Sequence, residues 1–580
     1  MLDEEAEKNI QSWLAQEYDD KTKDTIRQML NADDPELNNA FYTNLAFGTG
    51  GMRGIMGVGT NRMNRYTIMR ATQGLANYIE EENLPNPSVL IGYDSRHHSR
   101  EFAEIAARVL AANEIDVYIA SDIRPTPWVS FGCRFKRCNA AIMITASHNP
   151  PEYNGYKVYW SDGAQVLPPH DKGIIEDVNK IESLSEIKKT DLKSPFITWI
   201  DEEIDNAYLK AIRPLSLCPD QNKTKGENLK VLYSSLHGTG IKLLPKAMQD
   251  WGFSNLTLVE KQCIPDGDFS AAPSPNPEDP EALKMGVEQL LKENLDLLIA
   301  TDPDADRVGA VVNHQGKAVY LNGNQIACLG LYHILSEKKV QNTLPDNGAA
   351  IKTIVTTELF KKIANNFGVT CFNVHTGFKY VAEKIREWEE DSNPYQYLFG
   401  GEESFGYLWG TYARDKDGIS ASLLIQEIAL KQKLKGKTLI DLLNEIYERY
   451  GLFFETLKSV RFEETKEGKE KMAQSLDKLR NSPPKSLADI AVKTLDDYQK
   501  RKRFDLLSGH VTELPLAQSN VLIFWLEDDS KVMVRPSGTE PKVKLYCGVS
   551  QSTFSNQEEA LQTLKSKANT LINALESHLQ

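Results

Sequence analysis

Three aspartates at alternate positions form the most chemically distinctive segment of the chain. Asp302, Asp304 and Asp306 follow the strand-like apolar run Leu295–Ala300, and in an extended loop alternate side chains point the same way. Their carboxylates would converge, and converging like charges raise one another's pKa unless a cation offsets them. Hard oxygen ligands suit Mg²⁺ or Ca²⁺, and the segment lacks the Gly and Glu of an EF-hand. We therefore predict a metal site, the alternative being a solvated acidic turn.

A second polar segment, Thr145–Pro150, contains a candidate nucleophile, Ser147. A serine hydroxyl is a weak nucleophile unless a base or a cation activates it. His148 is adjacent in sequence, but neighbouring side chains diverge in an extended chain, so we do not expect it to be the partner base. A helix cap or a turn uses the same Ser, Asn and Pro residues. The segment by itself leaves catalysis and a turn as open alternatives.

Further polar loops offer groups that could bind an anionic substrate. Gly400–Gly406 presents carboxylates between glycines that permit close backbone approach, although by itself an acidic turn is the commoner explanation. Arg535–Lys542 combines a guanidinium fork, two hydroxyls and turn amides, which together suit phosphate; a plain turn is the alternative. Phe47–Gly54 matches neither nucleotide-binding glycine pattern, although Arg53 could still reach a phosphate. His375–Lys379 could supply a cation to a substrate.

Three of these loops occupy the same place in a repeated order of elements. The patterns of apolar residues predict strand–helix–strand–helix–strand three times, and a polar loop follows the last strand of each copy. Those last strands are predicted at Ala140–Ile144, Leu295–Ala300 and Tyr395–Phe399. Ligands bind beyond the carboxyl ends of strands in open parallel sheets. The fold class predicted is α/β, with three similar domains and a smaller C-terminal α+β domain.

Linkers and changes in the pattern of charged and apolar residues suggest where these domains end. The charged stretch Ile181–Lys193, the polar stretch Pro219–Asn228 and the short segment Leu321–Asn324 separate the repeated copies. A long helical pattern, Ala421–Tyr450, is followed by a charged helical region that we expect to end near Tyr498. We predict domains at residues 1–212, 213–322, 323–452 and 453–580.

Bulk composition excludes several classes of protein. A net charge of -14 over 580 residues argues against a nucleic-acid binder, but a phosphate site needs only a local cluster of donors. The apolar runs are too short to span a membrane. Seven scattered cysteines without a C-x-x-C pair indicate reduced thiols. The acidic N-terminus lacks the pattern of a secretion signal, so we expect a cytoplasmic location.

Taken together, the loops resemble the signature loops of the α-D-phosphohexomutase superfamily, which includes phosphoglucomutase and phosphomannomutase. Thr145–Pro150 is similar to its phosphoserine loop, Asp302–Arg307 to its metal loop, Gly401–Ser404 to its sugar-binding loop and Arg535–Pro541 to its phosphate-binding loop. The four occur in the family's order and the resemblance covers nearly the whole chain. It implies four domains around a central cleft, the first three being similar α/β mixed-sheet domains, and it is closest to phosphoglucomutase.

The resemblance also implies an activity and roles for individual residues. It implies that glucose 1-phosphate and glucose 6-phosphate are interconverted through a phosphoserine enzyme, with glucose 1,6-bisphosphate as the priming intermediate. Catalytic roles are implied for Ser147, Arg53 and Lys157. The implied ligands of Mg²⁺ are Ser147, Asp302, Asp304 and Asp306. The residues implied to bind substrate are His148, Arg307, Lys379, Glu402, Ser404, Arg535, Ser537, Gly538 and Thr539.

Alternatives remain at this point. Within the superfamily, a phosphomannomutase or a phosphopentomutase would share the framework. A phosphatase could use the same serine and metal. It would need no second phosphate site, however, and the Arg535 loop indicates one. A non-catalytic scaffold is expected to lose Ser147 or an aspartate, and neither is lost. The expected partner is a small sugar phosphate and neither nucleic acid nor membrane, whereas the sequence does not predict the oligomeric state.

Overall fold

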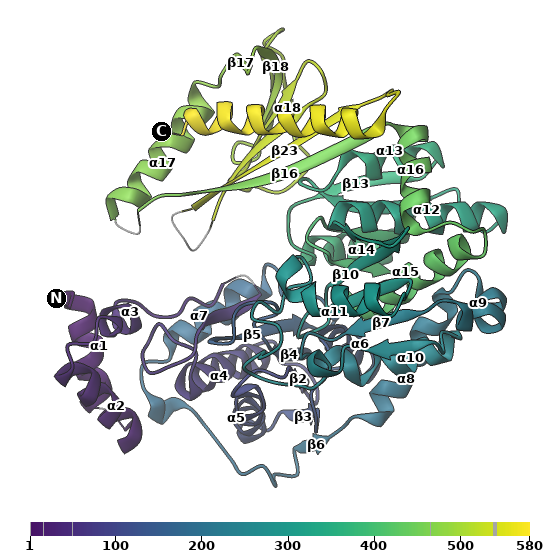
Figure 1. The fold of residues 1–580 in the computed structure, drawn as a ribbon. Coiled ribbons are helices and arrows are strands. Elements are labelled where there is room, and N and C mark those ends of the chain that lie inside the picture. Colours follow the sequence, from purple (N-terminus) through teal and green to yellow (C-terminus); the bar gives the residue numbers. More distant parts are fainter. Residues whose placement is uncertain (1, 16, 49, 464–465, 538–541, 580) are drawn as a thin grey trace. The chain divides into compact units, whose positions relative to one another are not determined.

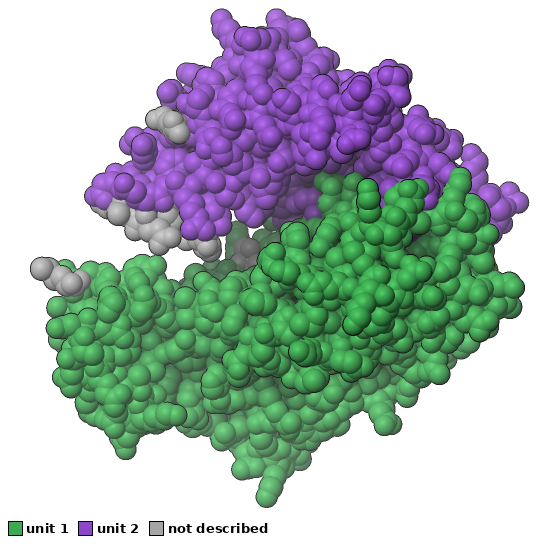
Figure 2. Space-filling view, viewed as in Figure 1, with its two compact units in different colours: residues 1–326, 378–400, 404–438 green, residues 327–377, 401–403, 439–580 purple. Residues whose placement is uncertain are grey.

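The computed structural model describes residues 2–15, 17–48, 50–463, 466–537 and 542–579. The chain forms two compact units, coloured separately in Figure 2. The first comprises residues 1–326, 378–400 and 404–438, and the second comprises residues 327–377, 401–403 and 439–580. No helix within the described residues is both long enough and apolar enough to cross a membrane.

The first sheet in the chain has six strands in the order β1-β5-β4-β2-β3-β6 (Figure 1). Its central strands run parallel, whereas β5 is antiparallel to both β1 and β4. The strands are β1 (Gly51–Ile55), β2 (Ser88–Tyr93), β3 (Asp116–Ile119), β4 (Ala140–Ile144), β5 (Tyr153–Trp160) and β6 (Ile197–Trp199). The helices in this part of the chain are α1 (Glu4–Ala15), α2 (Asp20–Asn31), α3 (Glu36–Phe41), α4 (Arg65–Glu81), α5 (Ser99–Ala112), α6 (Thr126–Lys136), α7 (His170–Lys180) and α8 (Glu202–Ile212).

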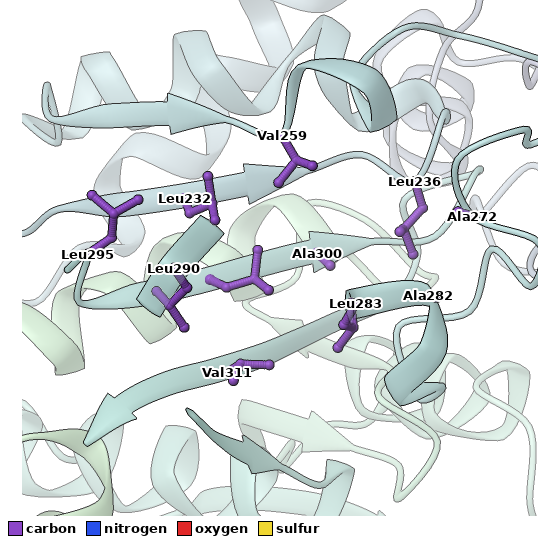
Figure 3. Close-up of a cluster of buried hydrophobic side chains, with 11 residues drawn as sticks. Leu232, Leu236, Val259, Ala272, Ala282, Leu283, Leu290, Leu295, Ala300 and Val311 are labelled. Carbon is purple, nitrogen blue, oxygen red and sulfur yellow. The ribbon is translucent and has the colours of Figure 1, made fainter. Parts of the chain in front are cut away.

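The second sheet repeats this plan with five strands in the order β11-β10-β9-β7-β8. Parallel strands β7, β8 and β9 are again followed by an antiparallel strand, β10. Figure 3 shows leucine, valine and alanine side chains packed between the strands and α11, which is where this domain buries its apolar face. The strands are β7 (Val231–Ser234), β8 (Leu256–Leu258), β9 (Leu297–Thr301), β10 (Val308–His314) and β11 (Lys317–Leu321). The helices are α9 (Pro219–Lys225), α10 (Leu244–Trp251) and α11 (Pro280–Lys292).

The third copy follows the same order of elements. In the second unit, β12 and β13 pair in parallel on either side of α13. The elements of this copy are α12 (Gly323–Val340), β12 (Gly348–Thr353), α13 (Glu358–Asn366), β13 (Thr370–Val374), α14 (Lys379–Glu390), β14 (Gln396–Gly401), β15 (Tyr407–Trp409), α15 (Gly418–Lys433) and α16 (Leu439–Tyr450). The helical pattern predicted as continuous is two helices, because Gly436 adopts a φ of 71° and ends the first of them.

The C-terminal part of the second unit is an antiparallel sheet in the order β16-β23-β22-β21-β18-β19-β20, with β17 paired to β18. Helix α18 lies along β16 and β23 (Figure 1). The charged helical region ends at Asn481 and not near Tyr498, because the segment before Tyr498 is paired in the sheet as β18. The elements are β16 (Leu452–Arg461), α17 (Lys466–Asn481), β17 (Ser486–Leu487), β18 (Ile490–Asp497), β19 (Lys502–Asp505), β20 (Val511–Glu513), β21 (Leu522–Leu526), β22 (Lys531–Pro536), β23 (Lys542–Gln551) and α18 (Gln557–Ser577).

The predicted fold class is confirmed: three α/β domains precede a β-rich C-terminal domain. The strand–helix–strand–helix–strand order recurs as β2 to β4, β7 to β9 and β12 to β14. A polar loop follows the last strand of each, as the sequence pattern indicates. Pro219–Lys225, expected to be part of a linker, instead forms the short helix α9.

Candidate active site

The predicted metal ligands Asp302, Asp304 and Asp306 lie directly after β9 and are buried. Carboxylate oxygens of the three all lie within 4.8 Å of one another. The segment is a turn and not the extended loop predicted, because Ala305 has a φ of 51° and its N–H donates to Asp302 O at 2.9 Å. The carboxylates therefore converge as predicted, but they do so because the chain turns and not because side chains alternate along an extended segment.

The chemistry of this cluster fits a divalent cation. Oδ1 of Asp304 and Oδ1 of Asp306 are buried and accept no hydrogen bond from any residue that the structure describes. Burying a carboxylate oxygen without a donor is costly unless a cation contacts it. Burial raises the pKa of Asp302, and the carboxylates of Asp304 and Asp306 raise it further. An oxygen-preferring cation would relieve both effects.

Two lysines supply positive charge to the same cluster. Lys157 Nζ donates to Asp304 Oδ2 at 2.7 Å and to Asp306 Oδ2 at 3.2 Å. Burial acts to raise the pKa of Asp304, but the Lys157 ammonium and the hydrogen bonds from Lys157 and Thr126 together hold that pKa below its usual range. Lys416 Nζ lies 3.2 Å from Asp306 Oδ2.

Lys416 is absent from the set of residues predicted from the sequence. It belongs to the run Arg414–Asp417, four charged residues directly before α15, all of them buried. Charged side chains are seldom buried unless they are paired. A run of charged residues beside an apolar helix is therefore the signal that could have identified Lys416 as a site residue. Its partner Asp415 also accepts hydrogen bonds from Tyr159 OH at 2.9 Å and Gln165 Nε2 at 3.0 Å.

Ser147 lies after β4, at the carboxyl end of the first sheet, and faces the metal-binding candidates. Its hydroxyl donates to Asp302 Oδ2 at 2.8 Å. His148 Nδ1 lies 3.2 Å from the same hydroxyl oxygen, so the expectation that these neighbouring side chains diverge is wrong. The reason is the left-handed backbone of Ser147, with a φ of 54°, which bends the chain away from the extended form. Burial, with Arg307 and Arg53, lowers the pKa of His148 to about 2.

Arg53 and Arg307 both lie beside this cluster. Antiparallel pairing of β1 with β5 sets Gly51 opposite Lys157, and Arg53 Nη1 donates to Asn149 Oδ1 at 3.1 Å in the serine loop. Gly51 has a φ of 134°, and a Cβ there would lie 1.9 Å from the carbonyl oxygen of Tyr156. The close pairing of these two strands therefore requires glycine.

Arg307 is tied to the metal-binding turn through its main chain. Its N–H donates to Asp302 Oδ1 at 3.0 Å, and its Nη1 donates to Glu278 Oε1 at 2.7 Å. Both contacts lie within the first unit, as do Ser147, Lys157 and the three aspartates. The structure thus brings together eight of the predicted residues in one place: Ser147, His148, Arg53, Lys157, Asp302, Asp304, Asp306 and Arg307.

The predicted sugar-binding loop follows β14. Ser404 belongs to the first unit, where Phe405 O accepts a hydrogen bond from Val308 N at 3.1 Å and holds the loop against the strand after the aspartate turn. Lys379 starts α14 in the same unit, and burial lowers its pKa. Glu402 belongs to the second unit, where its Oε1 accepts a hydrogen bond from Gly377 N at 3.0 Å.

The predicted phosphate-binding loop lies at the end of β22 in the second unit. Arg535 is paired with Lys544 of β23, and Ser537 N donates to Lys542 O at 2.7 Å. Gly538 and Thr539 lie outside the residues that the structure describes. The β22–β23 pairing therefore fixes both ends of this loop.

Comparison with known proteins identifies the family. Three profiles match, described as phosphoglucomutase/phosphomannomutase α/β/α domain I over residues 44–185, domain II over residues 206–316 and domain III over residues 322–450. The chain belongs to this family. It is therefore a phosphohexomutase, an isomerase that transfers a phosphoryl group within one sugar.

Individual relatives agree with this assignment. A phosphoglucomutase of Staphylococcus aureus strain bovine RF122 / ET3-1 is 37% identical over 557 residues, which cover 95% of this chain and 97% of the relative. One from Staphylococcus haemolyticus is 38% identical, covering 89% and 92%. Among solved structures, parafusin from Paramecium, a phosphoglucomutase in an open form, superposes with a TM-score of 0.69 at 20% identity, covering 92% of this chain and 96% of that one. A Burkholderia thailandensis member of the family gives 0.65 at 18% identity, covering 91% and 97%.

Proposed function

We propose that the protein interconverts glucose 1-phosphate and glucose 6-phosphate by way of a phosphorylated Ser147. In the proposed cycle, phosphoserine gives its phosphoryl group to the free hydroxyl of the sugar phosphate. The P–Oγ bond breaks as the new P–O bond forms, and Ser147 Oγ takes up a proton to match the one that the sugar hydroxyl releases. The resulting glucose 1,6-bisphosphate turns around and returns its other phosphoryl group to Ser147.

The observation that carries this proposal is the 2.8 Å contact between Ser147 Oγ and Asp302 Oδ2 beside three converging carboxylates. Phosphoryl transfer depends mainly on positioning and on offsetting negative charge. Asp302, Asp304, Asp306 and the oxygen of Ser147 would hold Mg²⁺, which when bound neutralises charge on the transferring group.

The remaining predicted residues receive roles from the same scheme. Lys157, hydrogen-bonded to two of the aspartates, holds positive charge beside the reacting oxygen, and Arg53 steadies the serine loop through Asn149. Glu402 and Ser404 would bind sugar hydroxyls and Lys379 the substrate, with His148 and Arg307 contributing at the serine loop. Arg535, Ser537, Gly538 and Thr539 would bind the phosphate that is not reacting. A phosphatase needs no such second phosphate site.

Ser147→Ala tests the proposal directly. We expect turnover of glucose 1-phosphate to be lost and the mass shift of one phosphate on the Ser147 peptide to disappear after treatment with glucose 1,6-bisphosphate. Ser185→Ala, which removes an exposed hydroxyl bonded to Ser183, is the matched control and should behave as wild type. Normal mutase activity in Ser147→Ala would overturn the proposed role.

The sugar preference is the finer part of the proposal. Its support is the name phosphoglucomutase carried by relatives 37% and 38% identical to this chain. Steady-state kinetics with glucose, mannose, ribose and glucosamine phosphates should give the highest kcat/KM for glucose 1-phosphate. A higher value for mannose or ribose phosphate would instead assign a phosphomannomutase or a phosphopentomutase. Release of inorganic phosphate at the rate of isomerisation would indicate a phosphatase.

A further inference from the structure

A buried arginine outside the predicted site, Arg96, lies behind the segment that carries Ser147. We propose that Arg96 is the positioning residue that fixes Ser147 in its left-handed conformation and so aims its hydroxyl at the Asp302 carboxylate. The inference rests on the proposed role of Ser147 and adds to it a residue that touches neither the substrate nor the transferring group.

The contacts of Arg96 converge on the main chain of the serine loop. Nη2 donates to Ser147 O at 2.6 Å and also to Asn149 O. Nη1 donates to Pro150 O at 2.8 Å and to Tyr153 O at 3.0 Å. One guanidinium thus holds four carbonyl oxygens that would otherwise repel one another. Its side chain is fully buried, so water does not compete for these hydrogen bonds.

The partners of Arg96 hold it in place from two sides. Its Nε lies 3.3 Å from Asp94 Oδ2, and its own N–H donates to Asp94 Oδ1 at 3.0 Å. Its guanidinium carbon lies 4.9 Å from the centre of the Phe269 ring, which belongs to the second repeated domain. A planar guanidinium stacks well on an aromatic face while its edge donates hydrogen bonds. Arg96 is therefore rigid enough to act as a template for the loop.

A second path leads from Asp94 to the other main-chain group of the same serine. Asp94 Oδ2 accepts a hydrogen bond from Thr145 Oγ1 at 2.6 Å, and Thr145 Oγ1 accepts one from Ser147 N at 2.8 Å. Both the N–H and the carbonyl of Ser147 are thus connected to the Asp94–Arg96 pair.

The left-handed conformation explains why such a template is needed. Ser147 has a φ of 54°, and a non-glycine residue in this region is strained and persists only where its surroundings enforce the conformation. Without Arg96 the loop would relax toward a commoner conformation and the hydroxyl would move relative to Asp302. A misplacement of about 1 Å lowers a transfer rate by about a hundredfold.

Arg96→Lys is the informative substitution. Lysine keeps the charge but offers donors at one point, so it cannot hold four carbonyls spread around a planar fork. We expect kcat to fall about a hundredfold, with the rate of Ser147 phosphorylation by glucose 1,6-bisphosphate falling in parallel and KM for glucose 1-phosphate changing less than threefold. In Arg96→Gly, added guanidinium ion should restore part of kcat, because it can refill the cavity.

Matched controls separate positioning from general stability. Arg480 is also buried and pairs with Asp497 in the C-terminal sheet domain, so Arg480→Lys should leave kcat within twofold of wild type and Arg480→Gly should show no guanidinium rescue. Thr145→Val removes the acceptor of Ser147 N while keeping the shape of the side chain. If the Arg96 variants do not fold, Thr145→Val is still expected to lower kcat without raising KM.

These measurements distinguish the positioning role of Arg96 from the proposed role of Ser147 as phosphoryl carrier. Wild-type kcat and phosphorylation rate in Arg96→Lys, or in Thr145→Val if that alone folds, would overturn the positioning role while leaving Ser147 as the phosphoryl carrier. An equal loss of kcat in Arg480→Lys would likewise assign a stability role to Arg96. Retained mutase activity in Ser147→Ala would instead overturn the proposed function itself.

Discussion

Replacing Glu358 with glutamine would unbalance a buried ion cluster in the second unit. Glu358 Oε1 accepts hydrogen bonds from Lys352 Nζ at 3.0 Å and from Lys531 Nζ at 2.7 Å. The lysine side chains are only 0% and 6% exposed, and that of Glu358 is 28% exposed. Glutamine has nearly the same shape but no charge, so the variant removes the carboxylate that both ammonium groups contact.

The expected loss follows from these exposures. Removing one partner of a buried ion pair costs about 3–5 kcal/mol, because the remaining charge is not compensated. Glu358 is partly exposed, so water screens it, and we expect the lower end, about 3 kcal/mol. Lys531 begins β22, which ends at the predicted phosphate-binding loop, so the loss should also loosen that loop.

The pH dependence of the wild-type protein has a defined sign. Burial alone would raise the pKa of Glu358, but the Lys352 and Lys531 ammonium groups outweigh burial and hold this pKa below its usual range. A carboxyl whose folded pKa is lowered stabilises the fold above its unfolded pKa of about 4.3. That stabilisation is lost as the pH falls from there through the folded value, and Glu358→Gln should abolish this part of the acid sensitivity.

Hydrogen exchange measured by mass spectrometry resolves the effect by region, which matters because a chain of several domains need not unfold in one step. Peptides from β12, α13 and β22 should exchange faster in Glu358→Gln at pH 7, while those of the first sheet are unchanged. Asp477→Asn is the control, because Asp477 is 68% exposed in its pair with Arg480 and such pairs contribute less than about 1 kcal/mol. Equal exchange in Glu358→Gln and Asp477→Asn would refute the reasoning.

Two further substitutions test charges elsewhere in the structure. Lys416→Met removes one of the ammonium groups that face Asp306, so isothermal titration should show Mg²⁺ binding tightened about tenfold by the loss of a nearby like charge; unchanged or weaker affinity would contradict this. Burial raises the pKa of Glu455 to about 7, so its ionisation destabilises the fold as the pH rises from the unfolded pKa through 7. Glu455→Gln should therefore raise the melting temperature more at pH 8.5 than at pH 5, and an equal rise at both values would count against it.

The fold was largely predictable because its signals are local. The last strand of the first copy was predicted to the residue as Ala140–Ile144. The last strands of the other two copies, predicted at Leu295–Ala300 and Tyr395–Phe399, lie at Leu297–Thr301 and Gln396–Gly401. Where the predicted secondary structure was wrong, an interaction that the local pattern does not show determined the element. Gly436 ended a helix within an unbroken helical pattern, and β18 formed in a charged segment because β19 and β21 pair with both its edges.

The candidate site was predicted in its residue types but not in its geometry. Spacing identified Asp302, Asp304 and Asp306 as a converging set, yet the turn at Ala305 produces the convergence. Lys416 lies 110 residues after Asp306 in the sequence, and no local pattern connects the two.

Local patterns in the amino-acid sequence are enough to predict the order of strands and helices, the position of each polar loop after a strand and the family to which these loops belong. These properties depend on apolar periodicity and on short motifs, which neighbouring residues carry. The folded chain is needed to see that Ser147 has a left-handed backbone, that His148 contacts its hydroxyl and that Arg96 holds its carbonyl. The reason is physical: a strained backbone conformation and a buried charge persist only where distant segments supply the hydrogen bonds that offset their cost.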